Sequence, residues 1–414
     1  MISQARPVDA PVSLRASRAH KAGLWLTVLT GAVIPVSTSL TEILTTLVLV
    51  LWFVAGHYKM FWTRMRSHPV ARSAAILYLM LILGVVYTSA DLRDSFGILG
   101  KYRELILIVA YLSFLDNEKT RHMCLVGFGA AMVLTLIGSF FQYYIASPST
   151  DPNLRVGLPF KNSITHSLLM AVFAFGLMVH VFSRRENRNR IIALSFLLAV
   201  VVFNLFFMVD GRTGYVLFYL LGFLFLFQKF KLRYAVMGVA VLVAFHFTLS
   251  SVSPLYQTQW DFLTRGITKY MDRGDAASSI GMRIEFSKNS YEIMMERPLL
   301  GHGTGSFRQR YADHAATNQL ERVTDNPHNE YLMLGVQTGW MGIGLFFYFI
   351  YTLWRYSFSL DPYHRSLAQG LAVMVTFGAL ANSLLMDHTE GMLIGWLAAV
   401  LYSPLGLASK TENA

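Results

Sequence analysis

The sequence predicts an all-α polytopic membrane protein with about 12 transmembrane helices. Hydrophobic residues make up 54% of its 414 residues and charged residues only 14%, whereas a soluble domain carries about 25% charged residues. Stretches of the roughly 20 apolar residues that a helix needs to cross a bilayer recur along the chain. This composition excludes a disordered chain and argues against a soluble globular protein.

The predicted spans begin after a polar and basic segment that ends at Lys21. Because this segment has no cleavage site, we interpret the first span as retained and not as a signal peptide. The first two spans, the fourth and the eighth are short or interrupted. In chain order the spans cover residues 22–38, 40–56, 73–90, 102–116, 123–146, 163–183, 191–209, 213–228, 234–250, 330–354, 366–386 and 391–407.

The distribution of positive charge predicts the orientation. An even number of spans puts both termini on one side, where the connecting segments hold 20 Lys and Arg residues against 6 in the short segments opposite. Cytoplasmic loops carry such an excess, so both termini should be cytoplasmic. This rule also explains the net charge of +11, so we expect no nucleic-acid partner.

The predicted topology divides the chain into three parts. These are residues 1–250 with nine spans, a periplasmic or extracellular loop at 251–329, and residues 330–414 with the last three spans. The loop holds nine Lys and Arg and nine Asp and Glu residues, with aromatic residues throughout. Its segment Arg283–Arg297 has the periodicity of an amphipathic helix, which Pro298 would end. A structured loop of this kind is a favourable place for active-site residues.

The chain offers few ligands for a metal ion. Its single cysteine, Cys124, excludes an intrachain disulfide and a zinc site built from several cysteines. The outer loops contain no Asp-x-Asp pattern that would hold Mg²⁺ on a diphosphate. We therefore expect no metal and no cofactor, and arginines would have to neutralise any bound diphosphate.

Two arginines on the outer side are candidates for that task. Arg212 follows Asp210 in a tight turn between two spans, and Arg283 lies at the start of the predicted loop helix. A guanidinium matches phosphate oxygens and keeps its charge, and a helix N-terminus also favours anions. The alternatives are a snorkelling Arg212, an Arg212–Asp210 pair, and a solvated Arg283.

Other charged residues gather on the same side, close to the hydrocarbon region where charge is costly. The cations could extend a diphosphate site, and the acids could orient side chains or pair with the arginines. The cytoplasmic side has only solvated runs of charge, so any chemistry is expected outside. These outer residues are Lys101, Arg103, Lys161, Glu330 and Asp387.

The segment Pro298–Phe307 contains three alternating glycines and His302. Such a loop could cradle a phosphate, but it lacks the Lys-Ser/Thr ending of a P-loop and follows no strand. The alternative is a simple chain reversal beneath the loop helix.

Pro327 predicts a helix start at the tenth span, which would put His328 in the first turn, beside Asn329. Backbone dipoles there would favour a neutral imidazole, which a general base near neutral pH requires. The alternative is a capping or interfacial histidine.

Together these features resemble the O-antigen ligase and polymerase superfamily, and most closely its O-antigen ligases. The resemblance rests on Gly211-Arg212-Thr213, Arg283 before a helix, the Pro298–Phe307 segment, and His328-Asn329-Glu330-Tyr331-Leu332 with Gly335 and Gly339. It covers about residues 150–400. The sequence departs from the family at Lys161, where a glycine- and asparagine-rich turn is usual, so Lys161 either contacts the donor or reflects a different substrate.

The resemblance implies a fold like that of membrane-embedded C-type glycosyltransferases and a metal-independent, inverting glycosyl transfer at the periplasmic face of the bacterial inner membrane. The donor would be O-antigen on undecaprenyl diphosphate, and the acceptor a sugar hydroxyl of lipid A–core oligosaccharide. Arg212 and Arg283 would hold the diphosphate and His328 would take the acceptor proton.

Two classes of alternative stay open. Within the superfamily, the protein could be an O-antigen polymerase or a protein O-oligosaccharyltransferase, although the chain ends soon after the twelfth predicted span, which favours a ligase. A membrane transporter is the alternative from another class. A transporter should carry its key polar residues near mid-membrane, whereas the candidates here gather on one surface.

Overall fold

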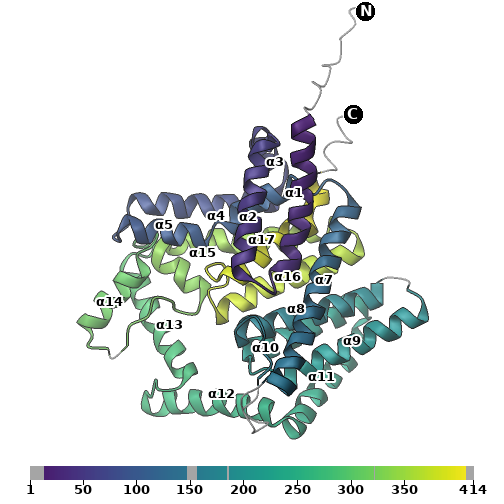
Figure 1. Ribbon diagram of the computed structural model, residues 1–414. Coiled ribbons are helices and arrows are strands. Elements are labelled where there is room, and N and C mark those ends of the chain that lie inside the picture. The colour runs from purple at the N-terminus through teal and green to yellow at the C-terminus, as the bar shows by residue number, and fades with distance from the viewer. Residues whose placement is uncertain (1–13, 147–155, 184–185, 321, 407–414) are drawn as a thin grey trace, which may run out of the picture.

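The computed structural model describes residues 14–146, 156–183, 186–320 and 322–406. Every element within these ranges is a helix (Figure 1). Six helices there are long and apolar enough to cross a membrane, or seven if the bent pair Thr38–Val54 and His57–Ser67 forms one span. This architecture fits a polytopic helical membrane protein, while the larger number of spans and the periplasmic loop domain stay predictions.

Each predicted span overlaps a helix. The fourth and the last correspond to α6 and α17, which have 9 and 15 residues and are shorter than the roughly 20 residues that cross a bilayer. The helices are α1 (Leu14–Val33), α2 (Thr38–Val54), η1 (His57–Met60), α3 (Phe61–Ser67), α4 (Pro69–Val86), α5 (Leu92–Lys101), α6 (Glu104–Leu112), α7 (Glu118–Phe141), η2 (Gln142–Ala146), α8 (Ser163–Ser183), α9 (Arg188–Phe207), α10 (Arg212–Lys229), α11 (Leu232–Val252), α12 (Pro254–Arg273), α13 (Ser279–Glu296), α14 (Phe307–Thr317), α15 (Glu330–Ser357), α16 (Pro362–Ala381), α17 (His388–Tyr402) and η4 (Ser403–Gly406).

Helix ends meet at two opposite faces of the bundle. At one face, Thr165 in the first turn of α8 donates a 2.6 Å hydrogen bond to Glu390 in the first turn of α17. At the other, His68 before α4 lies 2.9 Å from the carbonyl oxygen of Tyr402 at the end of α17. We call the first the His328 face, because His328 precedes α15 there, and the second the opposite face.

Helix α17 forms the centre of the bundle and is buried from Thr389 to Tyr402. A helix that is apolar all round is suited to this position. Gly391 and Gly395 let it approach α6 closely, since a Cβ atom on either would lie within 3 Å of Glu104. The short α6 and α17 are therefore packed in the core of the bundle.

Helix α15 is broken at Gly339, whose φ of 62° and ψ of −160° leave the helical region. In a continuous helix the N–H groups of Trp340 and Met341 would bond four residues back. Here they bond to the carbonyl oxygens of Pro298 and Leu299, at 2.7 and 3.3 Å.

The carbonyls freed by this break also find partners in the glycine-rich loop. Val336 accepts from the His302 N–H and Gln337 accepts from the Gly303 N–H, each at 2.9 Å. The loop thus replaces the helical hydrogen bonds on both sides of the break. Irregular backbone inside a membrane protein is tolerated where protein groups satisfy it in this way.

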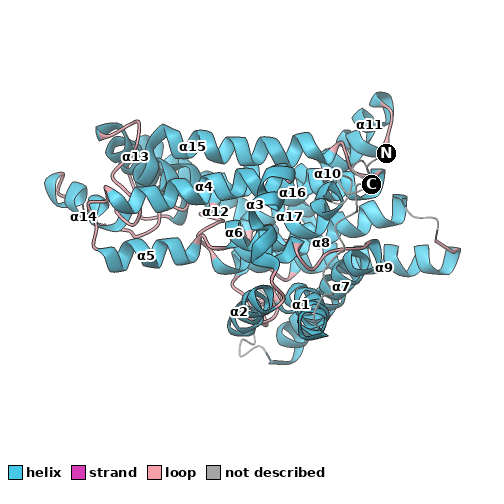
Figure 2. Ribbon diagram, turned by 90° about the horizontal axis from the view of Figure 1, so that it is seen from above, coloured by secondary structure: helices cyan, strands magenta, loops and turns pink. Residues whose placement is uncertain are grey.

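The predicted long loop folds into α12, α13 and α14. Figures 1 and 2 show α13 and α14 together beside one end of α5 and α15. The loop helix begins at Ser279 and not at Arg283, because Ser278 caps it by accepting a 3.0 Å hydrogen bond from the Gly281 N–H. Arg283 therefore lies in the second turn of α13.

Candidate functional site

Arg212 and Arg283 lie close together at the His328 face. Arg212 is the first residue of α10, and its Nη2 donates a 3.2 Å hydrogen bond to Ser279 Oγ in the first turn of α13. Arg283 lies one turn further along α13, on the same side as Ser279. Burial and the positive charge of Arg212 both lower the pKa of the Arg283 guanidinium. Among the described residues neither arginine has a salt-bridge partner, so the pair can accept an anion.

The turn before Arg212 is shaped by close helix packing. A Cβ atom on Gly211 would lie 2.1 Å from Ser167 Oγ, and one on Gly214 would lie 2.3 Å from Ser167 Cβ. The glycines let α10 press against α8. This contact fixes the start of α10, where Arg212 projects.

Arg283 also contacts the segment that follows α16. Its Nη1 donates a 2.9 Å hydrogen bond to the carbonyl oxygen of Ala381, the last residue of α16. The next residue, Asn382, bonds to both His328 and Asp387. The arginine pair and the histidine therefore adjoin one short segment, 381–387.

The Asn382 amide determines which nitrogen of His328 is free. Its Nδ2 donates to Asp387 Oδ2 at 2.5 Å, so its Oδ1 is the atom that lies 3.3 Å from His328 Nδ1. An oxygen can only accept, so Nδ1 carries the proton in this arrangement. In a neutral imidazole Nε2 is then the basic nitrogen. Within the described part of the chain Nε2 forms no hydrogen bond, so it can take up a proton.

The structure corrects the predicted position of His328. Asn329 is the N-cap of α15, and its side chain accepts from the Leu332 N–H at 3.1 Å, so His328 precedes the helix. His328 has a φ of 52°, which is uncommon for a residue with a side chain. The Asn326 side chain holds this conformation by accepting a 2.8 Å hydrogen bond from the His328 N–H. Local strain fixed by neighbours is typical of functional positions.

Asp387 lies behind the Asn382 amide. Burial raises the pKa of Asp387, against the opposing effect of the nearby charges of His328 and Lys101. Lys101 is exposed at the end of α5. The structure therefore brings Lys101, Asp387 and His328 close enough together for their charges to interact. The sequence predicts all three on the same side of the membrane.

Arg103 and Lys161 belong to a neighbouring group around α2. Arg103 forms a salt bridge with Glu42, and His388 Nε2 lies 2.6 Å from the same carboxylate. Lys161 Nζ donates a 2.9 Å hydrogen bond to Thr38 Oγ1. Burial lowers the pKa of the Lys161 ammonium, while the charge of Glu390 acts in the opposite direction. The charge of Arg103 is already balanced, so it is a weaker anion ligand than Arg212 or Arg283.

Two of the predicted supporting residues have structural partners. Glu330 is fully buried and accepts from the Tyr102 hydroxyl at 2.6 Å and from the Leu385 N–H at 2.9 Å. It therefore fixes the segment that carries Asn382 and Asp387. Asn329 caps α15 and also donates to the carbonyl oxygen of Leu380 at 3.3 Å.

The glycine-rich loop supports the chain-reversal interpretation. All its backbone N–H groups from 301 to 306 bond to protein acceptors, so none is directed at a ligand. His302 is buried, and its Nε2 donates to the carbonyl oxygen of Ile293 at 2.9 Å. Burial also lowers the pKa of His302. This loop braces α13 and α15 and does not cradle a phosphate.

Sequence reasoning missed three residues that organise the site. Asn382 connects His328 to Asp387, Asn326 fixes the backbone of His328, and Ser279 connects Arg212 to α13. For Asn382 the available signal was an asparagine and a serine that interrupt the apolar run after Ala381. Across the described ranges, no group of three or more His, Cys, Asp or Glu side chains could hold a metal ion.

Residues 205–347 match a family model described as O-antigen ligase. The match confirms the resemblance to the O-antigen ligase superfamily, and it covers about a third of the 414 residues. It includes Arg212, Arg283 and His328, whereas Asn382 and Asp387 lie outside it.

A curated protein of Haemophilus influenzae (strain ATCC 51907 / DSM 11121 / KW20 / Rd), named only as an uncharacterized protein, is 21% identical over 184 residues. The aligned region covers 42% of this chain and 45% of that relative. The chain thus matches less than half the length of its relative, whose name assigns no activity.

Proposed function

We propose that this protein is an O-antigen ligase that transfers O-antigen polysaccharide from undecaprenyl diphosphate to a sugar hydroxyl of lipid A–core oligosaccharide. It would work in the bacterial inner membrane, with its active site on the periplasmic side and both termini in the cytoplasm. One observation carries the proposal. Arg283, beside Arg212, and His328 contact the consecutive residues Ala381 and Asn382. The two neighbouring arginines and the basic Nε2 of His328 are thus held at one segment of the chain.

The arginine pair would bind the donor diphosphate. Two half-buried guanidinium groups beside each other are held there at an electrostatic cost, which an anion between them relieves. The bond between the anomeric carbon and the phosphate oxygen breaks in the reaction, and its electron pair passes to that oxygen. The charge on the leaving diphosphate therefore grows in the transition state, where the arginines bind it most strongly.

His328 would act as the general base. Its Nε2 takes the proton of the acceptor hydroxyl as the new bond forms between that oxygen and the anomeric carbon. Direct displacement inverts the configuration of that carbon. The imidazolium formed keeps its Nδ1 hydrogen bond to Asn382, and the Asp387 carboxylate stabilises its charge. This chemistry uses side chains alone and needs neither a nucleotide sugar nor a metal.

A reconstituted reaction tests the proposal directly. Purified protein is incubated with lipid-linked O-antigen and lipid A–core, with chelator and without nucleotide, and products are separated by size on a gel. A ladder on lipid A–core is expected. Lengthening of the lipid-linked donor alone would instead make the protein a polymerase, and transfer to an added protein would make it a protein O-oligosaccharyltransferase.

The transporter alternative needs its own readout. Arg212→Ala and His328→Ala should abolish the ladder at normal membrane levels and normal melting temperature. Arg308→Ala removes an exposed arginine of α14 and serves as the matched control. Movement of lipid-linked O-antigen across a vesicle membrane, with no product formed, would overturn the enzyme assignment.

A further inference from the structure

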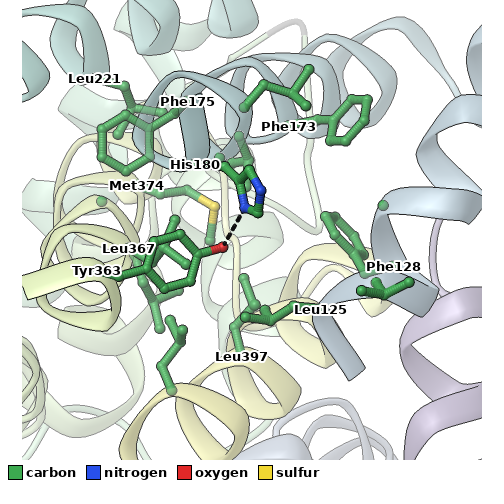
Figure 3. Close-up of a pocket in the computed structure, with 18 of the residues that line it drawn as sticks. Leu125, Phe128, Phe173, Phe175, His180, Leu221, Tyr363, Leu367, Met374 and Leu397 are labelled. Atoms are coloured by element: carbon green, nitrogen blue, oxygen red, sulfur yellow. Dashed lines mark hydrogen bonds between the residues drawn. The ribbon is translucent and has the colours of Figure 1, made fainter. Parts of the chain in front are cut away.

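A second ligand site lies between the helices, away from the His328 face. A cavity of about 250 Å³ opens between α7, α8 and α16, with contributions from α9, α10 and α17. Its walls are aliphatic and aromatic, as Figure 3 shows with Phe128, Phe173, Leu367 and Met374. The exceptions are His122, His180 and Tyr363, so polar groups gather in one part of the cavity.

These polar groups place one end of the cavity at the opposite face. His122 lies in the first turns of α7, His180 in the last turn of α8, and Tyr363 in the first turn of α16. The imidazole of His180 lies 3.4 Å from the Tyr363 hydroxyl, the contact drawn in Figure 3. At a rise of 1.5 Å per residue, Met374 in the cavity wall is about 12 Å along α16 from Asn382. The cavity is therefore separate from the proposed catalytic site.

The cavity opens sideways toward the surroundings of the bundle. Val126, in its wall, is 55% exposed, and His122 is also exposed. In a membrane such an opening faces the hydrocarbon of the bilayer. An apolar cavity with a lateral opening and polar groups at one end suits a molecule with a hydrocarbon chain and a polar headgroup.

Cations lie just beyond the polar end. Lys119 precedes His122 by three residues and Arg190 precedes Leu194 by four, so each shares a helix side with a residue of the cavity wall. Both are exposed, and Arg190 pairs with Glu186 at 2.8 Å. A phosphate at the level of Lys119 and Arg190 would complete this arrangement.

We propose that the cavity binds one acyl chain of an anionic phospholipid whose phosphate lies beside Lys119 and Arg190 at the opposite face. The polar end of the cavity lies at the opposite face, and this position decides which class of lipid can bind. A lipid with its diphosphate at the His328 face would bring only the end of its chain here. It would leave the polar end of the cavity without a headgroup and Lys119 without an anion. The site therefore takes a lipid of the other leaflet and is independent of the proposed transfer reaction.

Two glycines allow the cavity to be filled. Gly176 lines it, and a Cβ atom there would have no atom within 4 Å. Gly129 lies on the opposite wall, with Phe173 at 3.8 Å as its nearest neighbour. Gly344 in α15 also faces open space but lies outside the cavity, so Gly344→Leu is the matched control for Gly176→Leu.

The test measures lipid binding by the delipidated full-length protein in detergent. Dioleoyl phosphatidylglycerol is added, and retained lipid is counted by native mass spectrometry. We expect Gly176→Leu to weaken binding by about tenfold or more, equal to about 1.4 kcal/mol, and Gly344→Leu to bind as the unchanged protein does. The lipid should raise the Tm of the unchanged protein and of Gly344→Leu only. Gly129→Val, which fills the opposite wall, repeats the test if Gly176→Leu does not fold.

Three results would overturn the proposal. The first is equal binding by Gly176→Leu and Gly344→Leu. The second is photolabelling by a diazirine-bearing acyl chain that is confined to residues outside the cavity wall. The third is selective retention of undecaprenyl phosphate over phosphatidylglycerol, which would assign the cavity to an isoprenoid chain. Glycosyl transfer is not measured in any of these assays, so their failure and that of the proposed ligase activity are distinguishable.

Discussion

His328 donates through Nδ1 to the side-chain oxygen of Asn382, at 3.3 Å, and this contact leaves Nε2 as the basic nitrogen. In many hydrolases a carboxylate occupies the corresponding position, whereas here a neutral amide separates the imidazole from Asp387. The amide fixes the tautomer and the ring orientation. The carboxylate behind it acts on the charge of the imidazolium through one intervening group.

Asn382→Ala should therefore lower kcat by about 10–100-fold, the loss that follows when a metal-ligating histidine loses its hydrogen-bond partner, with little change in KM. Asn289→Ala is the matched control, since Asn289 is a buried asparagine of α13 whose Nδ2 donates to Tyr311 at 3.0 Å. Equal losses of kcat in both variants, or a loss that appears mainly as a raised KM, would show that Asn382 does not position His328.

Replacing Arg283 separates the contribution of its charge from that of its planar shape. Arg283→Ala should lower kcat by about 100–1,000-fold, as the loss of a transition-state donor does. Arg283→Lys restores the charge but not the planar fork, so it should recover only part of that loss. Arg308→Ala should leave the rate unchanged. Full activity in Arg283→Lys would mean that a point charge is sufficient and that Arg283 does not bind the diphosphate through two donors.

Asp387 predicts a pH-dependent stability. Burial raises its pKa above the ordinary value of 3.8, so between 3.8 and the raised value the folded state binds more protons than the unfolded state. Stability from this group is complete below 3.8 and is lost as pH rises through the folded pKa. Asp387→Asn keeps the hydrogen-bond acceptor for Asn382 but cannot ionise. The Tm of Asp387→Asn relative to the unchanged protein should therefore increase as pH rises across this range.

The same variant separates stability from catalysis. Because the carboxylate stabilises the His328 imidazolium, Asp387→Asn should have a lower kcat near neutral pH even though its relative Tm is higher. A constant Tm difference across the pH range would contradict the buried, raised-pKa carboxyl. An unchanged kcat would contradict its electrostatic role.

The face of the site could be predicted from the sequence, but the partners of each residue could not. Arg212, Arg283, His328 and Asp387 converge because charged residues that flank apolar spans on one side must meet at one surface. Arg103 satisfied the same criterion, yet the structure pairs it with Glu42. Whether a cation already has a carboxylate partner depends on how the helices are rotated and packed. The predicted side of the membrane does not give this information.

Short-range geometry was also beyond the sequence pattern. The apolar run at 391–407 predicts a span, but it does not show that α17 is surrounded by other helices on all sides. Asn382 was overlooked because an asparagine after a helix is usually a terminator, and its two side-chain contacts are with Asp387 and with His328, 54 residues away in the chain. The glycine-rich loop left two interpretations open, since its sequence does not say which acceptors its N–H groups meet.

The loop yields the final prediction, which separates those two interpretations. Gly303 has a φ of 95°, and a Cβ atom there would lie 2.1 Å from Thr88 Cα. Gly303→Ala should therefore destabilise the fold by about 1–3 kcal/mol, the usual cost of overpacking. It should lower Tm without changing KM for the lipid-linked donor. Gly97→Ala is the control, because no atom lies within 4 Å of its Cβ position. A Gly303→Ala protein with normal Tm but a severalfold higher donor KM would return the loop to a phosphate-binding role, since only a contact with the donor could then explain the change.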